Sequence, residues 1–521
     1  MSGVRSALRE RFLIIWSEID PKYNEYLVFV ALGLISALSF IWPFADEFEN
    51  RYFSQSLAGF VLGITFVFAF GAFFERIYEK SEKESTATLF LHSFVYWLFY
   101  FMGALYWLVH PLTIDLSHHW MLIPFALVAV PAYLAIPLLL PVYVAKRFCK
   151  NVWVFALVFA TLTFLVMYFQ GHYAPGFPWV LPGYVWSRDV LCMQALSIWG
   201  IYGQTFFTLI IGCIWGVGFY WYKKNSKKCA LAVGITCSSL FLLYIFGFVR
   251  IRGSSEELTD FKIRCVQGSI PQEDKMNRRL SVRNLDLYLN LSRMESKYHD
   301  WSPDFVIWPE ASIPYLFTDE SVVLRQKLAG IIPNNGYLLT GAVRKDSADG
   351  SIYNSVVVLD QFGRNVANYD KKHLVPFGEY VPFRNLIPKV FAPIANSVGD
   401  FDIGKNSNVI NLKGLKIAFA ICYEAIFPGE FVSGDVDVIM NITNDGWFGH
   451  TSELVQHLNI VRARAIEEGI PLIRVTNFGI SAVFDAYGRR VESLRTDEVG
   501  VIDCYIPQKT EKTFYRKFFV D

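Results

Sequence analysis

The chain divides into two halves with different hydrophobic patterns. The first half carries long apolar runs near residues 26–44, 55–75, 88–110, 120–145, 151–170, 193–221 and 229–249. About 20 apolar residues in a helix are enough to cross a bilayer. The pattern therefore predicts a polytopic α-helical bundle of about seven spans over residues 26–250, preceded by a charged N-terminus at 1–25. Prolines at 124, 131, 137 and 141 predict a kink in the fourth span.

Basic residues are concentrated in alternate loops of this half. They occur in the first 25 residues and again at 76–83, 146–150 and 223–228, whereas the opposite loops carry only Arg51 and Arg188. Because positively charged loops stay in the cytoplasm, the N-terminus is expected there. An odd number of spans then places everything after about residue 250 outside.

From about Glu256 the pattern changes to short apolar strands that alternate with amphipathic stretches. Strands are predicted at 261–268, 304–308, 337–343, 354–360, 416–422, 436–442, 471–477, 480–486 and 499–505, and helices near 275–299, 320–331 and 452–469. This alternation predicts a layered α/β domain over 256–508 with a short tail at 509–521.

Three reactive side chains follow predicted strands. Cys422 ends an apolar run, Glu310 comes directly after Trp-Pro, and Lys371 begins Lys-Lys-His. Open α/β sheets usually place their chemistry at such strand ends. Each residue also has an ordinary explanation: a buried inert thiol, a solvated carboxylate and a surface lysine.

Together the three residues make a coherent nucleophilic site. A thiol at neutral pH needs a base or a cation to become reactive. Glu310 is a candidate base and acid, and Lys371 is a candidate stabiliser of the thiolate and of an oxyanion. His373 is the rival base, because in an extended chain it shares a face with Lys371.

Three motifs resemble the nitrilase superfamily: Trp-Pro-Glu at 308–310, Tyr-x-Lys-x-His-Leu-Val-Pro-Phe-Gly-Glu at 369–379 and Ile-Cys-Tyr-Glu at 421–424. Together with the membrane half, they are similar to the apolipoprotein N-acyltransferases of the Gram-negative inner membrane. The resemblance implies an αββα sandwich on the periplasmic side and a Glu310–Lys371–Cys422 triad.

The resemblance also implies the reaction and its participants. A phospholipid donates an acyl chain to Cys422 as a thioester, and the N-terminal amine of a diacylated apolipoprotein accepts it. Glu379, Tyr423 and Glu424 match supporting positions of the family, and Met276, Trp447 and Phe448 are expected to contact substrate.

The sequence departs from this family at two points. Met276 stands where the family usually has tryptophan, which leaves acyl or headgroup preference open. The family also usually has an eighth membrane helix after the catalytic domain. Here residue 521 falls where that helix is approached, so either it follows this sequence or this member lacks it.

Composition narrows the alternatives. The net charge is +1, so the protein has no strong positive field that would attract nucleic acid. The spacing of the eight cysteines indicates neither a disulfide framework nor a metal site. No metal and no cofactor are expected, and the chain is expected to be a monomer. Two alternatives stay open: a membrane-tethered nitrilase-type amidase or hydrolase, and a non-enzymatic transporter or scaffold.

Overall fold

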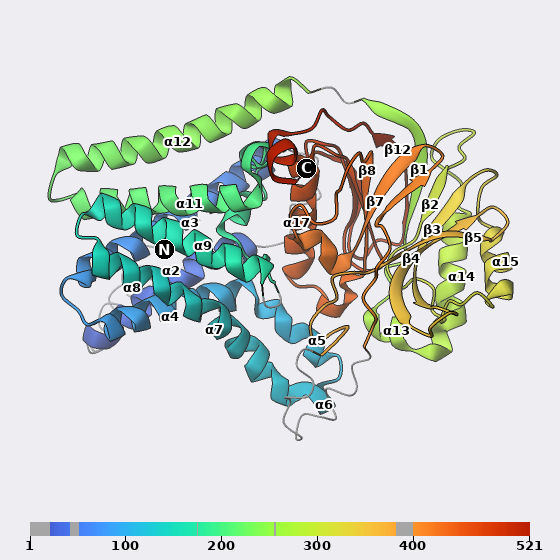
Figure 1. Ribbon diagram of the computed structural model, residues 1–521, viewed down its shortest axis with the longest axis horizontal. Helices are drawn as coiled ribbons and strands as arrows, with labels where there is room; N and C mark the ends of the chain where they lie inside the picture. Colours follow the sequence, from blue (N-terminus) through green and yellow to red (C-terminus); the bar gives the residue numbers. More distant parts are fainter. Residues whose placement is uncertain (1–20, 42–51, 174–175, 255–256, 382–399, 521) are drawn as a thin grey trace, which may run out of the picture.

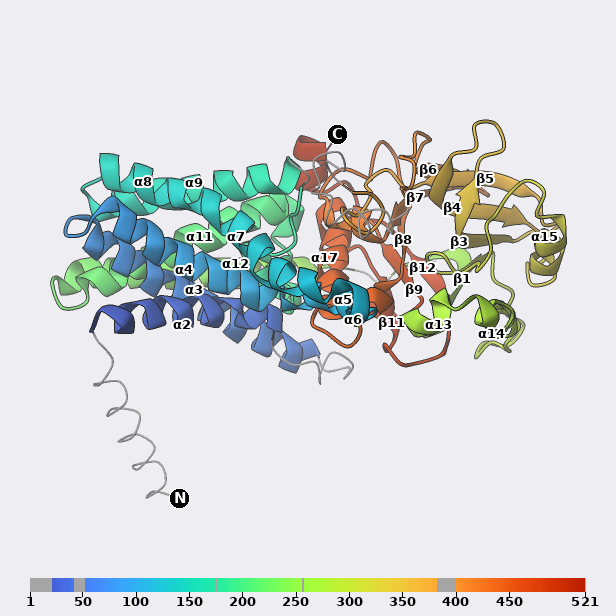
Figure 2. The same cartoon turned by 90° about the horizontal axis from the view of Figure 1, so that it is seen from below.

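In the computed structural model, residues 21–41, 52–173, 176–254, 257–381 and 400–520 are described. A helical bundle forms one half of the molecule and a pair of β-sheets forms the other (Figures 1 and 2). Residues 383–398, which follow the Lys371 motif at 369–379, lie outside the described residues.

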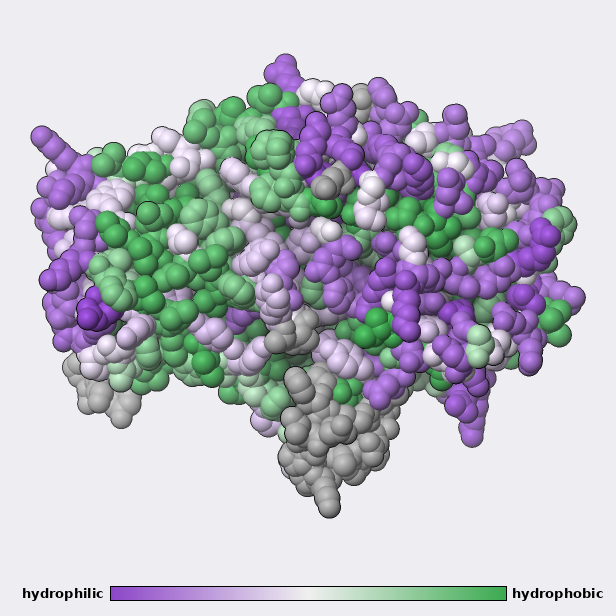
Figure 3. All heavy atoms as spheres, viewed as in Figure 1, coloured by the Kyte–Doolittle hydropathy of each residue, from purple (hydrophilic) through white to green (hydrophobic). Residues whose placement is uncertain are grey.

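Seven helical segments in the described ranges are long and apolar enough to cross a membrane, as predicted. They cover Asn24–Ile41, Leu57–Ser81, Thr86–Ala104, Trp120–Phe148, Val152–His172, Leu196–Trp221 and Ser226–Arg252. The helices themselves are α2 (Pro21–Ile41), α3 (Tyr52–Ser81), α4 (Thr86–Ala104), α9 (Val152–His172), α11 (Leu196–Trp221) and α12 (Ser226–Arg252). Hydrophobic side chains cover the visible face of this half (Figure 3).

The fourth span is broken, as its prolines predicted. Since proline lacks an N–H and clashes with the preceding turn, the helix changes type repeatedly through η2 (Trp120–Leu122), η3 (Phe125–Ala129), α7 (Val130–Ala135), η4 (Ile136–Leu138) and α8 (Leu139–Phe148). The third span is shorter than predicted. It ends at Ala104 and continues as short turns, η1 (Tyr106–Val109), α5 (His110–Thr113) and α6 (Leu116–His119).

The second half contains two six-stranded sheets. One has the order β12-β1-β2-β3-β4-β5 and the other β11-β10-β9-β8-β7-β6. The first contains β1 (Leu258–Gln267), β2 (Phe305–Ile307), β3 (Tyr337–Lys345), β4 (Ile352–Asp360), β5 (Asn365–Asp370) and β12 (Gly500–Pro507). The second contains β6 (Val409–Leu412), β7 (Leu415–Ile421), β8 (Val438–Thr443), β9 (Leu472–Thr476), β10 (Ser481–Phe484) and β11 (Arg490–Leu494).

The two sheets pack face to face with helices outside. Their inner faces share one buried core, which includes Ile307 from β2 and Phe419 from β7. Helices α14 (Ser281–Ser292) and α15 (Val322–Ala329) cover the first sheet, and α17 (Glu453–Glu468) covers the second. This is the αββα sandwich that the sequence resemblance implied.

Several element boundaries differ from the sequence prediction. Strands β5, β6 and β11 were not predicted, and the helix predicted at 275–299 is two helices, α13 (Gln272–Met276) and α14. The missed strands are short, and each is an edge strand of its sheet. Polar residues interrupt the apolar pattern in β5 and β11, and β6 is only four residues long.

Helix α17 joins the two halves. One face packs on the second sheet through residues such as Leu458 and Val461. The opposite face contributes Ile460, Ala463 and Ile466 to the core of the helical bundle. The helix is therefore buried on both sides, as its position between the halves in Figure 1 shows.

Candidate active site

The three candidate catalytic residues lie at strand ends that face one another across the sandwich. Glu310 follows β2, Lys371 directly follows β5, and Cys422 directly follows β7. Strand β5 runs antiparallel to β4, with Asp370 opposite Ser355, so Lys371 emerges beside Asn354. The backbone N–H of Lys371 donates to the carbonyl of Asn354 at 2.9 Å.

A network of side chains connects the two glutamates and the lysine. Lys371 Nζ lies 2.9 Å from Glu379 Oε1 and 3.5 Å from Glu310 Oε1. Asn354 Nδ2 donates to Glu310 Oε1 at 2.7 Å and to Glu379 Oε1 at 2.8 Å. Because Lys371 and both carboxylates are buried, these charge-assisted contacts fix their relative positions.

Asn354 was not singled out in the sequence. Its signal is a polar side chain at the start of the apolar strand β4, in Ile-Tyr-Asn-Ser-Val-Val-Val-Leu. That signal is weak, because strands commonly begin with polar residues. Only the pairing of β4 with β5 brings its amide between the two carboxylates.

Cys422 occupies a sharp turn at the end of β7. Its φ of 51° lies in the left-handed region, which costs free energy for a residue with a side chain. The chain turns here from strand into η9 (Cys422–Ile426). As a whole residue Cys422 is of intermediate exposure, whereas its neighbours Ile421 and Tyr423 are buried.

Electrostatics keep the resting thiol protonated. Burial raises the pKa of Cys422 above its ordinary value; the Glu310 carboxylate adds to this increase and Lys371 opposes it. Burial lowers the pKa of Lys371, but Glu379 and Glu310 outweigh burial and hold that pKa above its ordinary value. The lysine therefore stays cationic, and the thiol needs a base at the moment of attack.

Glu424 ties the cysteine turn to the lysine loop. Its Oε1 accepts from Tyr369 Oη at 2.7 Å and from the N–H groups of Lys372 at 2.7 Å and His373 at 3.2 Å. Its Oε2 accepts from the N–H of Ile421 at 2.7 Å. Burial raises the pKa of Glu424, while these donors oppose the increase.

The structure separates His373 from the glutamate–lysine network. Residues 371–373 follow β5 rather than extend it, so His373 does not share a face with Lys371. The His373 ring stacks on Phe427 at 4.3 Å between centroids, and its Nδ1 lies 3.2 Å from Glu430. This geometry favours Glu310 over His373 as the base.

Tyr423 and Phe448 contact the helical half. The Tyr423 hydroxyl donates to the carbonyl of Gly176 at 2.9 Å. The Phe448 ring meets Trp107 edge-on at 5.0 Å. Met276 and Trp447 are both exposed, with 58% and 40% of their surface accessible, so they are available to an incoming ligand.

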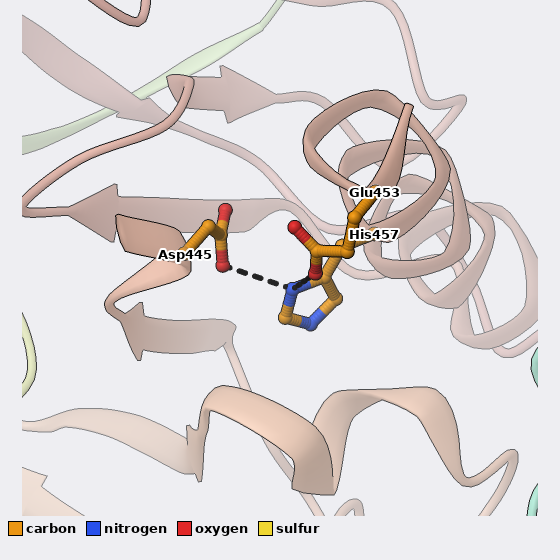
Figure 4. A group of neighbouring side chains, drawn as sticks. All are labelled: Asp445, Glu453 and His457. Atoms are coloured by element: carbon orange, nitrogen blue, oxygen red, sulfur yellow. Dashed lines mark hydrogen bonds and ion pairs between the residues drawn. The ribbon is translucent and has the colours of Figure 1, made fainter. Parts of the chain in front are cut away.

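Asp445, Glu453 and His457 form a second buried polar cluster (Figure 4). His457 Nδ1 is 3.1 Å from Asp445 Oδ1 and 3.4 Å from Glu453 Oε1. The three residues have ligand atoms within 4.8 Å of one another, a spacing compatible with a metal ion. However, the Arg474 guanidinium contacts Asp445 and lies 3.3 Å from His457 Nδ1.

Arg474 makes this cluster a poor metal site. Its fixed positive charge lies where a cation would bind and would repel a divalent ion. With His457 protonated, two carboxylates balance two cations without any metal. The cluster lies close to the cysteine, since the Asp445 carboxylate helps to raise the pKa of Cys422; the Thr443 hydroxyl donates to Asp445 at 3.1 Å.

Comparison with known proteins agrees with this architecture. Residues 262–515 match the carbon-nitrogen hydrolase family model, and residues 51–214 match the apolipoprotein N-acyltransferase N-terminal domain. The protein is thus a multi-pass membrane member of the carbon-nitrogen hydrolase class.

Two curated relatives define the family more narrowly. An apolipoprotein N-acyltransferase of Rickettsia prowazekii is 34% identical over 85% of this chain and 88% of its own length. One of Rhodopseudomonas palustris is 33% identical over 80% of both chains. The chain belongs to the apolipoprotein N-acyltransferase family and is an acyltransferase.

Two solved structures each resemble about half of this chain. A CN-hydrolase superfamily protein from Xanthomonas campestris covers 50% of this chain and 96% of its own, at 19% identity and a TM-score of 0.35. Nit3 of Saccharomyces cerevisiae, a nitrilase superfamily member, covers 51% and 97%, at 16% identity and a TM-score of 0.36.

Proposed function

We propose that this acyltransferase moves an acyl chain from a phospholipid to the N-terminal amine of a diacylated lipoprotein through a thioester on Cys422. The observation that carries this proposal is the network in which Asn354 and Lys371 hold Glu310 and Glu379 beside the strained cysteine turn. The names of the relatives supply the lipoprotein acceptor.

In the first half-reaction, Glu310 takes the thiol proton as sulfur attacks the ester carbonyl. The Lys371 ammonium and the backbone N–H of Tyr423 stabilise the oxyanion. When the ester C–O bond breaks, Glu310 returns the proton to the departing lysophospholipid oxygen. Glu379 keeps Lys371 oriented, since its Oε1 is the nearer carboxylate contact of the ammonium.

In the second half-reaction, the neutral amine of the lipoprotein attacks the thioester carbonyl. A carbon–nitrogen bond forms, the carbon–sulfur bond breaks, and Glu310 transfers the amine proton to the departing sulfur. Amide formation restores the thiol without any external reductant or energy source.

We also propose that the catalytic half lies on the periplasmic side of the inner membrane. Basic residues at the helix ends remote from the sheets support this orientation. Lys80 and Lys224 pair there with Glu84 and Glu79, and Lys146 donates to the carbonyl of Glu84. The hydrophobic band in Figure 3 then spans the bilayer, with both lipid substrates at its outer surface.

The decisive experiment follows the acyl group on the purified full-length protein. Incubation with phospholipid is expected to add one acyl mass to the wild type and none to Cys422→Ala, measured by intact-mass spectrometry. Adding a diacylated lipopeptide should remove the adduct and yield a triacylated peptide. Acylation of Cys422→Ala, or fatty acid release that the lipopeptide does not redirect, contradicts the proposal.

A further inference from the structure

A second lysine, Lys275, contacts the backbone of Glu310, whereas Lys371 contacts its carboxylate. Lys275 belongs to α13, and its Nζ donates to the backbone carbonyl of Glu310 at 2.8 Å. The same short helix is attached to the loop before η10 (Asp445–Phe448) by Gln272, whose side chain accepts from Asn444 Nδ2 at 2.8 Å. The ammonium group is thus held against the turn that carries the proposed base.

That turn is backbone-strained and tightly packed. Ala311 has φ 46°, in the left-handed region. A Cβ placed on Gly341 of β3 would lie 2.4 Å from the carbonyl oxygen of Pro309 and 2.5 Å from Cα of Glu310. The Glu310 carbonyl has left the sheet ladder, and Lys275 supplies a donor to it.

Charge balance gives Lys275 a second role. Glu310 and Glu379 bring two negative charges into a buried site, whereas Lys371 brings one positive charge and lies closer to Glu379. An unbalanced buried charge is costly. A protonated Lys275 makes the total zero, and the total stays zero when the thiol proton moves from Cys422 to Glu310.

The other charged groups near Lys275 are paired or exposed, so Lys275 acts mainly on Glu310 and Cys422. On its own helix, Asp274 pairs with Arg283 of α14 at 2.8 Å, and Glu273 is exposed. Arg278 and Arg279 of η6 (Arg278–Leu280) are exposed. Burial lowers the pKa of Lys275 to about 8, while Glu310 and Cys422 oppose the decrease. The ammonium form therefore predominates at neutral pH.

We propose that Lys275 is a positioning residue of the acyl-transfer site: it fixes the Glu310 turn and, as a second cation, stabilises the negative charge that passes between Glu310 and Cys422. This inference rests on the proposed thioester chemistry. It assigns a role to a residue outside the glutamate–lysine–cysteine triad.

The test measures the rate of Cys422 acylation by phospholipid between pH 6 and pH 10, in the wild type and three variants. Lys275→Met removes the charge, and Lys275→Arg retains it across this range. Lys327→Met is the matched control, because Lys327 is half exposed and pairs with Asp286 on the outer helices.

At pH 7, Lys275→Met is expected to lower the maximal rate at least tenfold, with KM for phospholipid changed less than twofold. The wild-type rate should fall as pH rises through about 8, where Lys275 loses its proton, and approach that of Lys275→Met above pH 9. In Lys275→Arg this decline should move upward by at least one pH unit, and Lys327→Met should follow the wild type.

Three results overturn the inference. One is a Lys275→Met profile equal to that of Lys327→Met. Another is a change in KM alone, which would indicate substrate binding. The third is a wild-type decline near pH 8 that Lys275→Arg does not move, and this comparison holds even if Lys275→Met fails to fold. Absence of any adduct on wild-type Cys422 would instead contradict the proposed function.

Discussion

At the scale of single residues, the site depends on carboxylates that receive more than one donor. Glu424 is the clearest case, because two of its donors come from the loop after Lys371, one from Tyr369 of β5 and one from the end of β7. Its carboxylate therefore connects Lys371 and Cys422 without touching either side chain. This is a positioning role, and it follows from hydrogen bonds rather than from proximity alone.

Replacing Glu424 by glutamine should separate these two loops. The amide group would place an N–H against a backbone N–H, which leaves a buried donor unpaired at a cost of about 1–3 kcal/mol. Glu424→Gln is expected to lower the unfolding temperature and slow Cys422 acylation at least tenfold. Tyr369→Phe, which removes a single donor, is the control at about 1 kcal/mol. Equal acylation rates for Glu424→Gln and wild type would contradict this role.

Sequence reasoning predicted the triad and two carboxylates beside it, Glu379 and Glu424, but neither Asn354 nor Lys275. Cys422 and Glu310 come at the ends of apolar runs that are visible along the chain, whereas Lys371 follows β5, a strand that the apolar pattern did not predict. Asn354 and Lys275 act through contacts set by tertiary structure: the register of β4 against β5 and the approach of a five-residue helix to a turn. His373 shows an error of another kind. The prediction that it shares a face with Lys371 assumed an extended chain, but β5 ends at Asp370.

At the scale of elements, α17 determines how the two halves meet. Gln456 is its central contact with the bundle: its side-chain oxygen accepts from the indole N–H groups of Trp179 at 2.8 Å and Trp107 at 3.2 Å. Its amide donates to the carbonyls of Phe40 and Ala104, both at 3.0 Å. The sequence predicted the apolar face of this helix. It did not predict that Gln456 is buried, because the hydrogen-bond partners of its side chain lie in the helical bundle.

Replacing Gln456 by leucine should uncouple lipid turnover from thiol reactivity. The substitution leaves two indole donors and two carbonyls unpaired, so the unfolding temperature should fall by several degrees. Acyl transfer from phospholipid is expected to drop at least tenfold, while alkylation of Cys422 by iodoacetamide stays within about twofold. Gln508→Leu, at an exposed strand end, is the control. Parallel loss of both reactivities would contradict the prediction.

The buried cluster of Asp445, Glu453 and His457 determines how the free energy of unfolding depends on pH. Burial raises the pKa of Glu453 to about 7, with Asp445 adding to the increase. Burial lowers the pKa of His457, but Asp445 and Glu453 outweigh it, so the net pKa is raised. Both groups bind protons more tightly in the folded state, so their contribution to stability is largest at low pH and is lost as pH rises through these values.

Glu453→Gln isolates this effect, since glutamine resembles the protonated acid. The difference in unfolding temperature between the variant and the wild type should increase from pH 5 to pH 8 in favour of the variant. In free energy of unfolding, titration of this carboxyl accounts for up to about 3 kcal/mol, at 1.4 kcal/mol per pKa unit. Scanning fluorimetry in detergent measures it. A difference that is constant or shrinks with pH would rule out titration of Glu453.

At the scale of the whole molecule, one arrangement explains why both halves exist. The bundle presents apolar side chains to lipid, and the sandwich stands at one end of it, joined through α17. Span number and fold class were predictable because bilayer thickness and strand periodicity impose strong patterns. How the halves dock was not predictable, because it depends on isolated polar contacts.

The orientation of the molecule can be tested by labelling from one side. In a background carrying Cys149→Ser, Cys229→Ser, Cys237→Ser and Cys422→Ser, which removes the partly or fully exposed thiols of the described residues, intact spheroplasts should expose Ser347→Cys, on the loop after β3, to an impermeant maleimide. Asn225→Cys, in the turn before α12, should react only after the membrane is permeabilised. The reverse pattern would place the catalytic half in the cytoplasm and contradict the proposed periplasmic site.

The hydrogen bond from Tyr423 to Gly176 has a geometric consequence for substrate choice. It joins Tyr423, the neighbour of the proposed nucleophile Cys422, to the bundle itself, which ties the level of the sulfur to that of the spans. An ester must rise or sink to that level to react. Lipids with the same headgroup but an ester bond at a different depth in the bilayer should therefore react with Cys422 at different rates.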